Sequence, residues 1–126
     1  MAENRDYIVQ PQDGGNIMIS EDVIASIAAL AVREVEGVYG LSVNASLDIS
    51  SILGKKNLSK GIRVTLSENE VEIACNLVVK MGQPVVTVAK NVQEGIAKEV
   101  ESMTGVRPVR VNINVCGVAL PKETQK

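Results

Sequence analysis

Residues 85–118 read VVTVAKNVQEGIAKEVESMTGVRPVRVNINVCGV, and two hydrophobic periods follow one another in this stretch. In its first part the apolar residues recur at helical spacing, at Val85, Ala89, Val92, Ile96, Val100 and Met103. From Val109 to Val115 apolar and polar residues alternate, as in a strand with one buried face. Gly105 stands between the two parts, where a left-handed residue commonly ends a helix. We therefore predict a helix and a strand that place most of their apolar side chains in a core, which leaves few polar groups here for catalysis.

A similar boundary lies near the start of the chain. Gly14-Gly15 precedes a short strand over residues 16–19, and Ser20 is a good N-cap for the helix that follows. We expect this helix over residues 21–36, ended by Gly37 in a left-handed conformation. Its apolar stripe consists of Val23, Ile24, Ile27, Ala28, Leu30, Ala31 and Val35.

The middle of the chain predicts a β-hairpin. Residues 62–66 and 71–79 alternate between apolar and polar, and the turn between them contains Asn69, which tolerates a positive φ. Together with the segments at both ends, this gives the element order βαββαβ. We predict an α+β fold in a single domain, with a mixed sheet of about four strands and two helices on one face. Right-handed crossovers would give a ferredoxin-like arrangement.

The predicted domain covers residues 14–118. Residues 1–13 are polar and aperiodic, so we expect a flexible N-terminal tail. Residues 119–126 form a C-terminal tail. Within the domain, residues 42–60 lack a clear period and predict a long loop, a length that is unusual unless the loop has a use.

Composition limits the classes of protein to which the chain can belong. Of the 126 residues 45% are hydrophobic, but only Tyr7 and Tyr39 are aromatic, so the core consists of small aliphatic side chains. The net charge of -2 argues against a general binder of nucleic-acid backbones. Acidic residues near the start do not fit a secretory signal, and the longest apolar run, residues 27–32, is far shorter than the roughly 20 residues that span a bilayer. We expect a cytoplasmic protein without a transmembrane segment.

The sequence offers no group that favours catalysis. It contains no histidine, which excludes Ser-His-Asp and Cys-His arrangements and histidine metal sites. Cys75 falls on the predicted core face, and Cys116 falls on the opposite face without a basic neighbour that would lower the pKa of its thiol. The two cysteines lack the paired spacing of a metal site and fit a reduced compartment, with a disulfide as the alternative. We expect no enzymatic activity, no cofactor and no metal.

Two surfaces remain as candidate binding sites. The first is the sheet face turned away from the helices, which is either wetted or packed against another subunit. The residues that we expect on it are Arg63, Thr65, Asn76, Val78, Arg110, Asn112 and Asn114. The second is a basic loop that contains Lys55, Lys56 and Lys60, which is either solvated or in contact with an acidic partner or a membrane surface.

One further motif points to a different class of function. Gly37-Val38-Tyr39-Gly40 has the GxxG spacing with which KH domains clamp a nucleic-acid backbone. Its middle residues are not basic, and it leads from a helix into an irregular region rather than into a second helix. A helix end followed by a turn is therefore the simpler interpretation, and a KH-like nucleic-acid-binding module is the alternative.

Several motifs, in the same order along the chain, resemble the alkaline shock protein family of Gram-positive envelope stress proteins. The resemblance covers about residues 14–118. It rests on Gly15–Ser20, Val23–Ala28, Glu34–Val38, Lys60–Val64, Val92-Gln93, Val100–Gly105 and Val109–Val115.

This resemblance implies a cytoplasmic, non-enzymatic protein linked to envelope stress or homeostasis. Some family members self-associate and gather at the inner face of the membrane through a separate membrane-anchoring protein, so we expect a homo-oligomer and a partner of that kind. Other members have housekeeping roles and are encoded near a fatty acid kinase-like protein, which implies an accessory role in such a system as a further alternative. The chain lacks the long charged extensions of some stress-induced members, so the housekeeping type is at least equally compatible.

Overall fold

The computed structural model describes residues 7–42 and 61–120, which form two helices, a four-stranded sheet and a separate two-stranded ribbon. This is the α+β class that the sequence predicts, in one domain. In chain order the elements are β1 (Tyr7–Gln12), β2 (Gly15–Ser20), α1 (Glu21–Arg33), β3 (Val38–Leu41), β4 (Ile62–Ser67), β5 (Glu70–Lys80), α3 (Val85–Thr104) and β6 (Arg110–Ala119). The predicted long loop, beyond its first residue, and the outer parts of both predicted tails lie outside the described residues.

Strand β5 is the centre of the sheet. Strand β6 pairs with it in parallel, β4 pairs antiparallel with its first half, and β3 pairs antiparallel with its second half. The Asn76 amide donates to the Gly61 carbonyl at 2.8 Å, and the Asn76 carbonyl accepts from the Ser42 amide at 2.9 Å. Because the N–H and C=O of one strand residue point to the same side, β3 and β4 lie end to end along one edge of β5, while β6 occupies the other edge.

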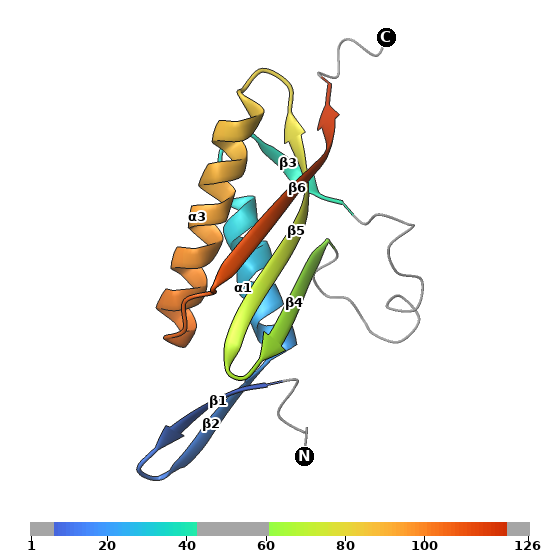
Figure 1. Cartoon of the computed structure of the whole chain (residues 1–126). Coiled ribbons are helices and arrows are strands. Elements are labelled where there is room, and N and C mark those ends of the chain that lie inside the picture. Colours follow the sequence, from blue (N-terminus) through green and yellow to red (C-terminus); the bar gives the residue numbers. More distant parts are fainter. Residues whose placement is uncertain (1–6, 43–60, 121–126) are drawn as a thin grey trace.

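Both helices pack on one face of this sheet; in Figure 1, α1 lies behind the strands and α3 stands at their left. Every second side chain of β5 points toward them, and none of these is more than 1% exposed: Val71, Ile73, Cys75, Leu77 and Val79. The alternate residues of β5 are only half-buried, so the opposite face of the sheet is left uncovered. Mixed strand directions and two helices on one face agree with the prediction.

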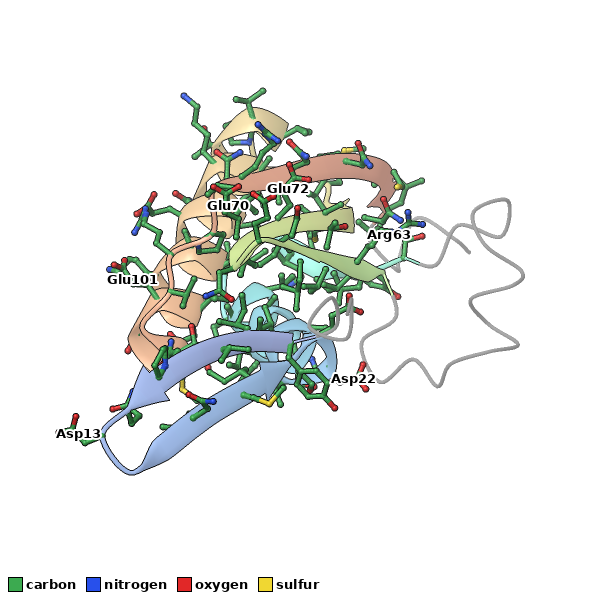
Figure 2. The ribbon with its side chains drawn as sticks, turned by 60° about the horizontal axis from the view of Figure 1, so that its bottom comes forward. Asp13, Asp22, Arg63, Glu70, Glu72 and Glu101 are labelled. Atoms are coloured by element: carbon green, nitrogen blue, oxygen red, sulfur yellow. The ribbon has the colours of Figure 1, made fainter. Side chains whose placement is uncertain are left out.

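The N-terminal part corrects two predictions. Residues 7–12, expected within a tail, form β1, which pairs with β2 and buries Ile8 to 1% exposure. The predicted strand 16–19 is β2, but it belongs to this ribbon, and the short β3 takes the expected fourth place in the main sheet. Figures 1 and 2 show the ribbon extending away from the sheet, and Figure 2 shows Asp13 at its tip. Asp-Gly between short apolar runs is a strong hairpin signal, and Asp13-Gly14 is the feature of the sequence that indicates this ribbon.

Two amide side chains attach the ribbon to the rest of the domain. Asn69 lies in the β4–β5 turn with a φ of 66°, the positive value expected for it, and its side chain holds both backbone groups of Val9. The Val9 amide donates to Asn69 Oδ1 at 3.2 Å, and Asn69 Nδ2 donates to the Val9 carbonyl at 3.1 Å. Gln10 Nε2 donates to the Thr104 carbonyl at the end of α3, at 2.7 Å. These hydrogen bonds tie the ribbon to the turn before β5 and to the C-terminal end of α3.

Replacing Asn69 by glycine is expected to loosen the ribbon while leaving the turn intact. Glycine accepts the positive φ, so the variant removes only the amide that grips Val9, and the loss is about 1 kcal/mol of local stability. Hydrogen exchange should become roughly fivefold faster at residues 7–12 and stay unchanged in β5. Glu68→Gly is the matched control, because Glu68 is the other positive-φ residue of this turn, and it should leave exchange in the ribbon unchanged. Equal exchange of the ribbon in the Asn69→Gly variant and the original chain would contradict this account.

Helix α1 ends at Arg33 rather than at residue 36. Gly37, with a φ of 95°, lies in the turn that follows instead of ending the helix.

Several side chains expected in the core are exposed. The sheet covers only part of the apolar stripe of each helix. The sequence did not predict this, because a periodic pattern does not specify how wide the covering layer is. The exposed residues, with their exposed fractions, are Val23 (46%), Leu30 (53%), Val85 (39%), Met103 (62%), Val109 (54%) and Val115 (36%).

Candidate functional site: the open face of the sheet

The seven residues predicted for a partner surface gather on the uncovered face of the sheet, which we call the open face. The strand register places them in rows across β4, β5 and β6, together with Glu72 and Ala74. Figure 2 shows where Arg63 and Glu72 lie on the sheet. The rows are Thr65, Glu72 and Arg110; Arg63, Ala74 and Asn112; Asn76 and Asn114; and Val78 beside Gly117.

Polar side chains on the open face bond to one another. The Arg110 guanidinium forms an ion pair with the Glu72 carboxylate, and Asn114 Nδ2 donates to Asn76 Oδ1 at 3.1 Å. The side chains of Arg110 and Glu72 are 60% and 39% exposed, so this pair adds little to stability. The ion pair and the amide pair both join side chains across the β5–β6 ladder.

Two bulges surround Val78, a feature that the sequence analysis missed. The β3 register shifts at Tyr39, and the β6 register shifts at Cys116, in both cases beside Val78. Its neighbours across the strands are glycines: nothing lies within 4 Å of a Cβ at Gly40, and a Cβ at Gly117 would lie 3.9 Å from Val78. Glycine inside a strand pattern is the signal that could have indicated these bulges. At this end of the open face, Val78 is therefore flanked on both neighbouring strands by positions without a side chain.

The described residues contain no group of three or more potential metal ligands, and no helix in them is long and apolar enough to cross a membrane. Cys75 lies on the helix side of β5 and is fully buried, whereas Cys116 is exposed. The predicted basic loop, Lys55, Lys56 and Lys60, lies outside the described residues.

The GxxG segment does not form a loop between two helices. Gly37 is buried after α1, and a Cβ placed on it would lie 2.7 Å from Val88 Cγ2. Gly40 belongs to β3, where it pairs with Val78 of β5. The two glycines therefore serve a helix-to-strand turn and a bulge, whereas the simpler interpretation of the sequence expected a helix end followed by a turn.

Alkaline pH is expected to destabilise the fold through Cys75. Burial, reinforced by the charge of Cys116, raises the pKa of the Cys75 thiol from 9.0 to about 12. In the folded chain the Cys75 thiol thus keeps its proton at a pH where the thiol of the unfolded chain is ionised. The resulting stabilisation is complete below about pH 9 and decreases as the pH rises from about 9 to about 12. In denaturant titrations at increasing pH, the free energy of unfolding should fall by up to about 1.4 kcal/mol per pH unit more steeply than in Cys75→Ala. Parallel pH dependences in the two proteins would contradict this role of the thiol.

Comparisons with known proteins follow the same boundaries as the fold. A model of the alkaline shock protein 23 family, which is described as having a "cell envelope-related function", matches residues 9–120. The uncharacterized protein YqhY of Bacillus subtilis is 31% identical over 112 residues, 89% of this chain and 83% of that protein. YloU of the same organism is 35% identical over 106 residues, 82% of this chain and 88% of that protein.

More distant similarities were also found. A "Stress response regulator gls24 homolog" of Streptococcus pyogenes is 21% identical over 105 residues, which are 82% of this chain and 59% of that protein. Among solved structures, a MamM CTD variant is similar with a TM-score of 0.48 and 12% identity, over 77% of this chain and 96% of that one.

Proposed function

Because this chain belongs to the alkaline shock protein 23 family, of cell envelope-related function, we propose that it is a non-enzymatic interaction protein of envelope stress response or homeostasis. It self-associates and binds protein partners near the inner face of the membrane. The open face of the sheet is the surface that receives these partners.

The observation that carries this proposal is the incomplete covering of the sheet. Strands β5 and β6 are parallel, as in wholly parallel sheets that are covered on both faces, whereas β3 and β4 pair antiparallel with β5, a pairing that tolerates one wetted face. Here the helices bury one face only, while Ala74, Asn76 and Val78 stay half-buried on the other. A partner layered on the open face would cover these half-buried side chains and the β5–β6 pair on its second face.

The groups on the open face also favour binding over reaction. One ion pair and one amide pair hold their side chains in place, and amide groups can exchange hydrogen bonds with a partner at little cost. The apolar surface at Val78, flanked by Gly40 and Gly117, allows close approach of another backbone. A surface with a polar part and a flat apolar part fits a protein partner.

Site-specific photo-crosslinking tests this proposal. A photoreactive residue is placed at Thr65 or Asn112 on the open face and, as a matched control, at Lys90 or Lys98 on the exposed side of α3. After irradiation of intact cells, the open-face positions should give adducts of discrete mass with other proteins, enriched in the membrane fraction, and the α3 positions should not. Adducts with nucleic acid, equal adducts from both faces or none at all would count against the proposal. A kinase-like adduct in the soluble fraction would favour the accessory role instead.

A further inference from the structure

Strand β6 carries a row of backbone groups that face away from the sheet. The Asn76 and Lys80 amides of β5 point toward Gly61 and Gly37 on the β3/β4 side, so the odd-numbered residues of β5 point toward β6. In a parallel ladder only one residue of each register pair bonds across it. Ile73 pairs with Val111, Cys75 with Ile113 and Leu77 with Val115. The N–H and C=O groups of these three β6 residues therefore point to the outer edge of the sheet.

At each end of this row a local feature interrupts the series of outward-facing backbone groups. Gln93 of α3 donates from Nε2 to the Val111 carbonyl at 2.8 Å, which supplies that carbonyl with a side-chain donor in place of a strand. At the other end the register shift at Cys116 changes the direction of the following backbone groups. Among the described strands none pairs with this outer edge. The stretch left open consists of Ile113 and Val115.

We propose that Ile113 and Val115 pair antiparallel with the same residues of a second copy of this chain. A two-fold axis beside Asn114 sets Ile113 of each copy opposite Val115 of the other, and the N–H of each residue donates to the C=O of its counterpart. Asn114 then faces Asn114 of the second copy on the open side, and the apolar side chains meet on the helix side. This proposal rests on the self-association included in the proposed function and assigns it to one edge.

The edge fits a second copy because it complements itself. Its open stretch has the same apolar, amide, apolar order when read in either direction, so one register satisfies both copies. Edge strands are normally protected by lysine, proline, inward-pointing charge or a bulge, and residues 111–115, which precede the bulge at Cys116, contain none of these. Val115 is 36% exposed and would be covered by the pairing. The pairing also extends the open face across the two copies.

Amide hydrogen exchange measured at increasing protein concentration, together with the mass in solution, tests the proposal. The expected result is a dimer of twice the 13.4 kDa chain mass in which the amides of Ile113 and Val115 gain protection with concentration. The amides of Asn112 and Asn114, which point toward β5, should be protected at every concentration. A chain that stays monomeric, or a dimer in which Ile113 and Val115 gain no protection, would overturn the proposal.

A proline pair supplies the matched variants. Val115→Pro removes an outward N–H without touching the β5–β6 ladder, so the fold should remain and the dimer dissociation constant should rise roughly thirtyfold. Val118→Pro removes an outward N–H beyond the bulge and should leave dimerisation unchanged. Equal effects of the two prolines would overturn the assigned register. If Val115→Pro fails to fold, the exchange data on the unaltered chain decide alone. Open-face crosslinks at Thr65, on the other side of β5, report on partner binding independently of this edge.

Discussion

Replacing Ile96 by alanine is expected to lower the free energy of unfolding by about 3 kcal/mol. Ile96 is fully buried near the middle of α3, within the core that both helices form with the sheet. The substitution removes buried methyl groups and leaves a cavity among Val, Ile and Ala side chains. Because β-branched side chains have few alternative rotamers, this core can collapse onto the cavity only in part. Equilibrium unfolding in denaturant, followed by far-UV circular dichroism, measures the loss.

Val86→Ala is the control for this substitution. Val86 lies on the same helix but is 66% exposed, so its truncation removes little buried surface. The change in its unfolding free energy should stay within about 0.5 kcal/mol, and alanine's higher helix propensity acts in the stabilising direction. Comparable losses in the two variants would mean that α3 does not pack through the face that contains Ile96.

Gly37→Ala is expected to cost about 2 to 4 kcal/mol, from two causes that act together. Gly37 has a φ of 95°, which L-residues with a side chain rarely adopt. In addition, the new Cβ would lie 2.7 Å from Val88 Cγ2 and 3.0 Å from Gln83 Oε1, so α3 would have to shift. The Gly37 carbonyl also accepts a hydrogen bond from the Lys80 amide at 2.8 Å, which ties this turn to β5. Thermal and denaturant unfolding should both register the loss.

Gly40→Ala provides the comparison, since both glycines belong to the GxxG motif. Gly40 has no positive φ, and nothing lies within 4 Å of a Cβ built on it. Its substitution should change the unfolding free energy by about 0.5 kcal/mol or less. A large loss at both positions would contradict the separate roles that the structure gives them. Because the effect on stability is small, the Gly40→Ala variant is also suitable for testing whether a methyl group beside Val78 on the open face affects partner binding.

The sequence predicted the second half of the chain well. The helix over residues 85–104, the left-handed Gly105 with a φ of 82°, and the β4–β5 hairpin with its positive-φ Asn69 all agree with the structure. The buried Cys75 and the placement of the partner-surface residues on one face also agree, because both follow from the two-residue period of strands. The binding role of that face stays a prediction.

The N-terminal half was predicted less well, for a physical reason. A short strand that contains Pro11 and polar residues shows little periodicity, and β1 exists because β2, Asn69 and Thr104 hold it. The same applies to β3, whose four residues become a strand only by completing the edge of β5 beyond β4. Such segments gain their hydrogen bonds from groups that lie far away in the sequence, so local patterns carry little information about them.

By itself, the sequence determined the helices, most of their ends, the β4–β5 hairpin and the face to which each residue of β4, β5 and β6 belongs. These depend on spacing, capping and turn chemistry among residues a few positions apart. Only the tertiary structure decided that β3 and β4 share one edge of β5, that β6 has an open outer edge, and that Val9 bonds to Asn69, 60 positions away. Pairings of this kind depend on the path of the whole chain and on which edges and faces other elements have already covered.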